Sequence, residues 1–243
     1  MSWVFRLYDS TIGKKFIMAL TGFVLFGFVV IHMLGNLQIF IPGKGKVDER
    51  GNAVFDSSNR RVYEHKITEY GHLLKSNPAV LWGARGFLLA CVLAHILTMV
   101  QLTARNRAAR PEPYAMRRWR EAIPPARHMA LTGIMVGLYI IFHLLHFTTG
   151  HMHPSFVDGD VHGNFIRGFT EGWQGPVSAL VYVIANILLG MHLAHGAWSM
   201  FQSLGIAHPR YTPILKIGAR CVAALITLGN ISMPILVAVK AVT

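Results

Sequence analysis

Five apolar segments, each long enough to cross a lipid bilayer as a helix, constrain this chain more than any other feature. A membrane-spanning helix needs about 20 mostly apolar residues, because the hydrocarbon core is about 30 Å thick and a helix rises about 1.5 Å per residue. The segments cover about 16–41, 79–104, 128–150, 174–204 and 213–240. We therefore predict an all-α membrane protein, in which residues 1–243 form one transmembrane domain, an up-and-down bundle of five helices without an internal repeat.

The composition excludes several other classes of protein. Only 14% of the 243 residues are charged, against about 25% in soluble domains. The net charge is +12, but the basic residues gather between the apolar segments and accompany no nucleic-acid recognition motif, so we expect no nucleic-acid binding. The two cysteines, Cys91 and Cys221, are too few to hold an iron–sulfur cluster.

The distribution of basic residues predicts a cytoplasmic N-terminus. With that orientation, the inner segments 1–15, 105–127 and 208–220 carry 13 Lys and Arg residues and three acids. The outer segments 41–76, 151–173 and 240–243 carry nine Lys and Arg residues and eight acids. Because basic residues are concentrated on the cytoplasmic side of membrane proteins, a cytoplasmic N-terminus is favoured. The dense basic loop 105–127 is then a candidate docking surface on the cytoplasmic side.

Histidine is the ionisable residue that recurs inside the apolar segments. Ionisable side chains are costly inside a membrane and therefore indicate a functional site. Six of the 13 histidines lie deep in these segments: His32, His95, His143, His146, His192 and His195.

Four of these histidines predict two layers of metal ligands. His32, His95, His143 and His192 each lie about two-thirds of the way along successive segments. Because neighbouring helices run antiparallel, His32 and His143 share an outer depth, whereas His95 and His192 share an inner one, on the order of 12 Å away. Two facing imidazoles can occupy both axial positions of a haem iron, so the pattern predicts two haems b in one bundle. A zinc or copper site needs ligands that converge at one depth, so the two layers of histidines argue against such a site.

Depth alone does not choose within two histidine pairs. His143 and His146, like His192 and His195, are three residues apart and share a helix face. The unused member of each pair is a candidate for a haem propionate, for the pocket wall, or for a hydrogen bond to another protein group. Arg85, which lies inside the second segment, is a further candidate for a propionate, with snorkelling to the headgroups as the alternative.

Short motifs around these histidines resemble a known family. They are His32-Met-Leu-Gly-Asn36, Leu93-Ala-His95, Thr132-Gly133 with His143 eleven residues after the threonine, and His192-x-x-x-Gly196-x-Trp198-Ser199. Their order and spacing resemble the cytochrome b membrane-anchor subunit of succinate dehydrogenase and fumarate reductase, in its five-helix, two-haem, single-chain class. The long connection 41–76 departs from the compact pattern of that family.

The resemblance implies which residues bind iron and which proteins accompany the chain. His32 with His143 would ligate the outer haem, and His95 with His192 the inner haem. A flavoprotein with FAD and an iron–sulfur protein would bind the cytoplasmic face and oxidise succinate, a step of the tricarboxylic acid cycle. The chain itself would have no catalytic residue for succinate, and it would pass electrons to menaquinone in a bacterial inner membrane.

The quinone site is less constrained by the sequence. An outer site can use Glu69, His72 or Arg85, whereas an inner site can use the N-terminal region or His208. We favour the outer site. Two other functions compete with the whole interpretation: the cytochrome b anchor of a formate dehydrogenase or hydrogenase, and a transporter without haem. Transporters usually carry paired repeats or broken helices, and the sequence shows no sign of either.

Overall fold

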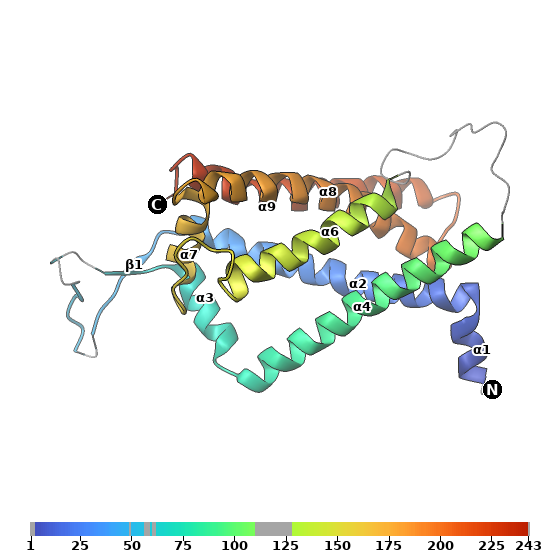
Figure 1. Cartoon of the computed structure of the whole chain (residues 1–243), viewed down its shortest axis with the longest axis horizontal. Coiled ribbons are helices and arrows are strands. Elements are labelled where there is room, and N and C mark those ends of the chain that lie inside the picture. The colour runs from blue at the N-terminus through green and yellow to red at the C-terminus, as the bar shows by residue number, and fades with distance from the viewer. Residues whose placement is uncertain (1–2, 49, 56–58, 60–61, 110–127, 243) are drawn as a thin grey trace. The chain divides into compact units, whose positions relative to one another are not determined.

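A computed structural model describes residues 3–48, 50–55, 59, 62–109 and 128–242. It confirms five helices that are long and apolar enough to cross a membrane (Figure 1). They are α2 (Thr11–Asn36), which continues into a 3-10 turn (Leu37–Phe40), α4 (Pro78–Ala108), α6 (Met129–His143), which continues into a π-helical turn (Leu144–Thr148), α8 (Gln174–Ser203) and α9 (Thr212–Ala238). The helix α2 begins five residues earlier than the sequence indicates.

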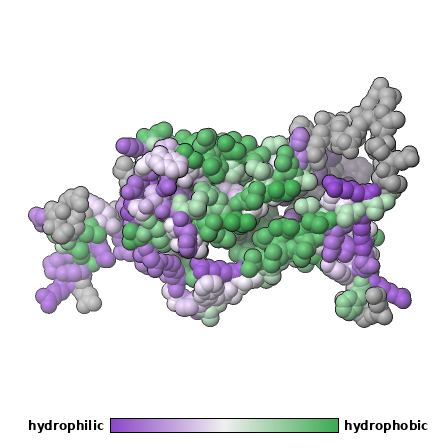
Figure 2. All heavy atoms as spheres, in the orientation of Figure 1, coloured by the Kyte–Doolittle hydropathy of each residue, from purple (hydrophilic) through white to green (hydrophobic). Residues whose placement is uncertain are grey.

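The surface of these helices is what a lipid environment requires. Large apolar side chains such as Phe23, Ile31, Leu89, Leu138 and Leu225 are exposed along them. Apolar residues cover the long helices, whereas hydrophilic residues gather over α3 and α7 (Figure 2). Contiguous exposed apolar surface of this extent is rare on soluble proteins, so these helices suit a multi-pass membrane protein.

The chain divides into two compact units, which we describe separately. The first unit comprises residues 1–30, 82–133 and 189–225, and the second comprises residues 31–81, 134–188 and 226–243. Each of the five long helices contributes residues to both units. In the second unit, the fully buried Phe169 and Val237 pack with Ala179 and Tyr182 into an apolar core.

Shorter elements complete the second unit. Two short antiparallel strands, β1 (Lys44–Gly45) and β2 (Tyr63–Glu64), pair within the long connection, and α3 (Lys66–Lys75) follows them. The sequence predicts a short surface helix at 63–74; the structure confirms a helix there but begins it at Lys66, because Tyr63–Glu64 form β2. The sequence does not indicate α7 (Val161–Thr170), which lies between α6 and α8.

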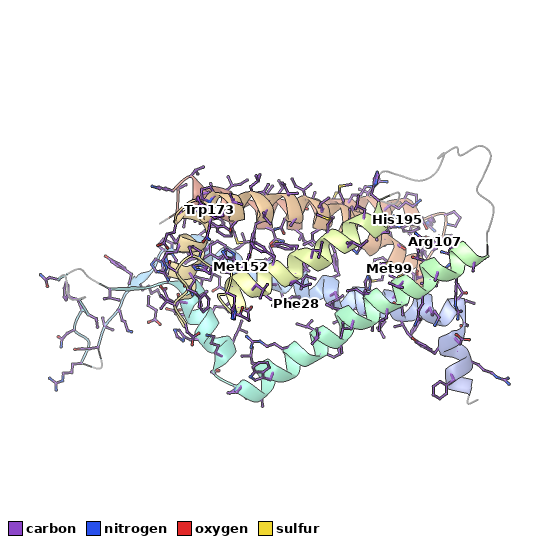
Figure 3. The ribbon with its side chains drawn as sticks, in the orientation of Figure 1. Phe28, Met99, Arg107, Met152, Trp173 and His195 are labelled. Carbon is purple, nitrogen blue, oxygen red and sulfur yellow. The ribbon has the colours of Figure 1, made fainter. Side chains whose placement is uncertain are left out.

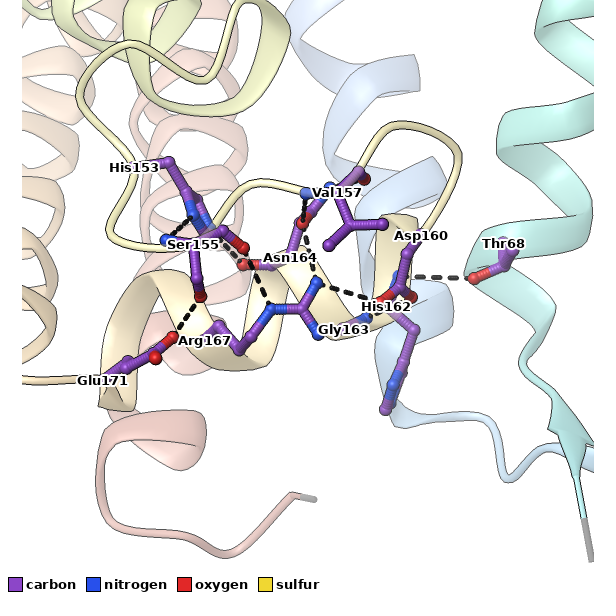
Figure 4. A network of polar contacts seen from close by, with 10 residues as sticks. All are labelled: Thr68, His153, Ser155, Val157, Asp160, His162, Gly163, Asn164, Arg167 and Glu171. Atoms are coloured by element: carbon purple, nitrogen blue, oxygen red, sulfur yellow. Dashed lines mark hydrogen bonds and ion pairs between the residues drawn. The ribbon is translucent and has the colours of Figure 1, made fainter. Parts of the chain in front are cut away.

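Polar contacts fold the segment around α7 (Figure 4). Asp160 caps the helix by accepting a hydrogen bond from the backbone N–H of Gly163, and it pairs with Arg167 at 2.9 Å. The backbone N–H of His162 donates to the hydroxyl of Thr68 at 3.2 Å, so α7 is joined to α3. These contacts hold His162 in place beside α3, where it takes part in the pocket described below.

In the first unit, charged contacts join the N-terminal helix α1 (Trp3–Asp9) to the end of α4. Arg105 on α4 pairs with the carboxylate of Asp9 at 2.5 Å. The buried Lys14, near the start of α2, lies 4.1 Å from the centre of the Tyr8 ring on α1. Arg105 is one of the basic residues of the candidate docking loop 105–127. The part of that loop at 110–127 lies outside the described residues.

Candidate functional site

The structure brings the four candidate ligands together in two pairs. In the second unit, the rings of His32 on α2 and His143 at the end of α6 have centres 5.7 Å apart. In the first unit, the rings of His95 on α4 and His192 on α8 have centres 6.4 Å apart. We call them the outer pair and the inner pair, after the depths expected from the sequence. All four rings are partly buried.

The spacing within each pair suits two imidazoles that share one iron ion. An imidazole nitrogen binds a first-row metal at about 2 Å, so two such rings on opposite sides of one ion have centres roughly 6 Å apart. Both observed separations lie near this value. That these four residues ligate haem stays a prediction.

Threonines from neighbouring helices contact both rings of the inner pair. The Nδ1 atom of His95 lies 3.2 Å from the hydroxyl of Thr21 on α2. The Nδ1 atom of His192 lies 3.4 Å from the hydroxyl of Thr132 on α6. Each ring is therefore held through Nδ1, which leaves Nε2 as the nitrogen suited to bind iron.

Glycines let these two rings lie close to the neighbouring helices. A Cβ atom added at Gly22 or at Gly133 would lie 3.3 Å from the Cε1 atom of His95 or His192, respectively, closer than an ordinary contact. Cβ atoms added at three other helical glycines, Gly27, Gly137 and Gly196, would meet none of the described atoms within 4 Å. These three positions therefore do not serve close helix packing among the described residues.

The outer pair has different hydrogen-bond partners. The Nδ1 atom of His143 lies 3.0 Å from the hydroxyl of Tyr182 on α8. The Nε2 atom of His32 lies 3.1 Å from the amide nitrogen of Asn36, one turn further along α2. Iron binding through Nε2 would therefore require His32 to turn away from Asn36, whereas His143 is already held through Nδ1.

The two extra histidines differ in their surroundings. His146 is fully buried in the π-helical turn, and its Nδ1 atom lies 3.1 Å from the same Tyr182 hydroxyl. Its Nε2 atom is buried without a hydrogen-bond partner among the described residues, which is unusual for a polar atom and suits contact with a bound polar group. His195 is partly buried on α8, three residues after His192 (Figure 3).

Of the three remaining site candidates, Arg85 and His72 are exposed, and Glu69 is paired with a lysine on its own helix. Arg85 is exposed on α4, with its guanidinium 4.9 Å from the ring centre of Trp82. Glu69 on α3 accepts a hydrogen bond from Lys66 at 2.6 Å, and this contact lowers the pKa of its carboxyl. His72 is exposed on the same helix. Glu69 and His72 lie three residues apart on α3, and neither lines the pocket described next.

A pocket of about 250 Å³ lies in the second unit. One of its lining residues, His65, immediately precedes α3, the helix that carries Glu69 and His72. Its polar side chains are His65 and His162, whose rings stack at 3.4 Å with an angle of 7° between them. Burial, followed by the proximity of His65, lowers the pKa of His162 to about 4. The rest of the wall is mostly apolar: Ile39, Phe40, Ile41, Pro42, Ala241 and Val242.

The described residues contain no group of three or more His, Cys, Asp or Glu side chains that could hold a metal ion. The interpretation from sequence missed Thr21, Tyr182 and the stacked histidines. A signal for Thr21 was present, because the pentapeptide Met-Ala-Leu-Thr-Gly occurs both at 18–22 and at 129–133.

No family model, no curated protein and no solved structure matches this chain. The resemblance to succinate dehydrogenase anchors therefore rests on the motifs around the four histidines.

Proposed function

We propose that this chain is the dihaem cytochrome b subunit of a succinate:quinone oxidoreductase in a bacterial inner membrane. The observation that carries the proposal is the pairing of four histidines from apolar helices, at 5.7 and 6.4 Å between ring centres. A haem iron that also binds two imidazoles would have no open coordination position, so haem held by these histidines would supply electron transfer rather than oxygen chemistry.

The residues around the histidines would orient the ligands. Thr21 and Thr132 contact the inner pair, and Tyr182 contacts His143 of the outer pair. His146, whose Nε2 atom has no hydrogen-bond partner among the described residues, is a candidate for contact with a haem propionate, which its full burial allows only if the neighbouring side chains move. His195 and Arg85 remain weaker candidates for such contacts, since Arg85 is exposed beside Trp82.

We further propose that the chain reduces menaquinone at its outer end. Electrons that move outward are helped by the membrane potential, which contributes about 2.3 kcal/mol per charge for each 100 mV. The pocket at His65 and His162 supports this site better than Glu69 and His72, because it combines an apolar wall with imidazole hydrogen-bonding groups. Its volume of about 250 Å³ suits a quinone ring rather than the whole lipid.

Succinate oxidation would take place on partner subunits. The chain would anchor a flavoprotein with FAD and an iron–sulfur protein at its cytoplasmic face, where the basic loop 105–127 is a candidate docking surface. Such a division of labour agrees with the two cysteines of the chain, which are too few to hold a cluster.

Purification from native membranes in mild detergent tests the proposal. We expect a reduced-minus-oxidised spectrum of b-type haem, together with a flavoprotein and an iron–sulfur protein as co-purifying subunits. A nickel or molybdenum protein in their place would indicate the anchor of a hydrogenase or formate dehydrogenase. Protein that carries no haem would contradict the proposal and favour a transporter.

A further inference from the structure

Two copies of one sequence pattern lie in α2 and α6. Each copy consists of Met-Ala-Leu-Thr-Gly followed by a histidine eleven residues after the threonine: Thr21 with His32, and Thr132 with His143. The expectation that the chain has no internal repeat overlooked this pattern. In each copy, the histidine belongs to the outer pair, so the role of the threonine and glycine needs a separate explanation.

The threonine and glycine of each copy contact one histidine of the inner pair in nearly the same way. The distances from the threonine hydroxyl to Nδ1 are 3.2 Å for His95 and 3.4 Å for His192. The glycine that follows lies equally close to each ring, because an added Cβ atom would be 3.3 Å from Cε1 in both cases. Two identical pentapeptides thus build two matching contacts from different helices.

The direction of the hydrogen bonds follows from the partners of each threonine. The hydroxyl of Thr21 donates to the carbonyl of Ile17 at 2.8 Å, and that of Thr132 donates to the carbonyl of His128 or Met129 at 3.1 Å. With its proton engaged, each hydroxyl oxygen can accept the N–H of the histidine. This arrangement favours the tautomer in which each inner histidine carries its proton on Nδ1 and its lone pair on Nε2.

We propose that Thr21 and Thr132 are equivalent positioning residues, which fix the tautomer and the ring orientation of the two inner haem ligands. This inference rests on the proposed dihaem function. A hydrogen bond from Nδ1–H makes an imidazole a stronger electron donor to iron, which stabilises the ferric state. Each repeat therefore positions one inner ligand and supplies one outer ligand.

The experiment compares valine and serine substitutions in the protein purified with its partner subunits. Thr21→Val and Thr132→Val remove the hydroxyl but keep the branched shape, whereas Thr21→Ser and Thr132→Ser keep the hydroxyl. Thr103→Val is the matched control, because Thr103 is half-buried on α4 and its hydroxyl contacts the Sδ atom of Met99 rather than a candidate ligand. The readouts are the midpoint potential of each haem and the ferric low-spin electron paramagnetic resonance signal.

We expect both valine variants to raise the midpoint potential of the same haem, the one lost on His95→Ala, and to leave the other haem unmoved. The double variant should shift it further, the serine variants should restore it, and Thr103→Val should leave both potentials unchanged. Unmoved potentials and resonance signals in both valine variants would overturn the positioning role, as would an equal shift in Thr103→Val. If one valine variant does not accumulate, the other decides the matter, because the two threonines are equivalent here. A wild-type protein without haem would instead overturn the proposed function itself.

Discussion

The Nδ1 atom of His143 lies 3.0 Å from the hydroxyl of Tyr182, and the Nδ1 atom of His146 lies 3.1 Å from the same oxygen. One buried phenol therefore joins a candidate iron ligand to a buried histidine that is not expected to bind iron. Because a phenol has a single proton, it can accept from one ring and donate to the other. If His143 binds iron through Nε2, its Nδ1–H donates to Tyr182, and Tyr182 donates to His146.

Tyr182→Phe should therefore change the outer haem without removing it. Loss of the acceptor for His143 should raise the midpoint potential of the outer haem, and two buried nitrogens without a partner should cost about 1–3 kcal/mol each. Optical redox titration and thermal unfolding in detergent measure the two effects. Tyr139→Phe is the control, since the Tyr139 hydroxyl contacts Asn186 at 3.4 Å rather than a ligand nitrogen. Equal potentials in Tyr182→Phe and wild type would contradict this role.

Single alanine substitutions of the four ligands should divide into two classes. His32→Ala and His143→Ala should each remove the outer haem, whereas His95→Ala and His192→Ala should each remove the inner haem, because each iron needs both of its imidazoles. His146→Ala should retain both haems. Pyridine haemochrome analysis gives the haem content of each variant. The pairing would be wrong if His146→Ala abolished a haem while His143→Ala left two.

Gly22→Ala and Gly133→Ala should disturb the inner haem. An added Cβ atom would lie 3.3 Å from the ring of His95 or His192, so the ring must move by a few tenths of an ångström. We expect a changed ferric low-spin resonance signal for one haem and lower haem occupancy in both variants. Gly218→Ala is the matched control on α9, where an added Cβ atom meets nothing within 4 Å of the described structure. The same disturbance in the control would point to general helix destabilisation.

The stacked His65 and His162 predict a pH-dependent stability of the second unit. The pKa of His162 is about 4, below its ordinary value of 6.5, because burial and the proximity of His65 outweigh the opposite effect of Asp160. The unfolded chain therefore binds more protons between these pH values, and the contribution of this group to stability is complete above pH 6.5 and falls as the pH drops toward 4.

His162→Phe should remove that contribution, because phenylalanine can stack on His65 but does not titrate. We expect the melting temperature of the wild type to fall more between pH 7 and pH 5 than that of the variant. An equal fall in both proteins would show that another group governs the response to acid.

Much of the fold was predictable because the membrane imposes a simple rule on sequence. Five apolar segments of sufficient length became five long helices, and α3 was visible in the polar connection. The helix α7 was not predicted, because it is short and part of what holds it is a tertiary contact, the hydrogen bond from the backbone N–H of His162 to Thr68 on α3. The π-helical turn at 144–148 has no sequence signature that we could use.

The candidate ligands were predictable, but their partners were not. Depth along antiparallel helices groups His32 with His143 and His95 with His192, and the structure brings the same pairs together. Depth says nothing about rotation around the helix axis, which decides that Thr21 contacts His95 and that Tyr182 contacts His143. Glu69 was a reasonable candidate for a quinone, but its carboxylate is engaged by Lys66 on the same helix.

An optical redox titration of the purified wild-type protein tests the central claim most directly. The two histidine pairs predict two b-type transitions with separate midpoint potentials, in a ratio of two haems to one chain. A single transition with one haem per chain would contradict the assignment of two ligand pairs, and the absence of any haem absorbance would contradict the account as a whole.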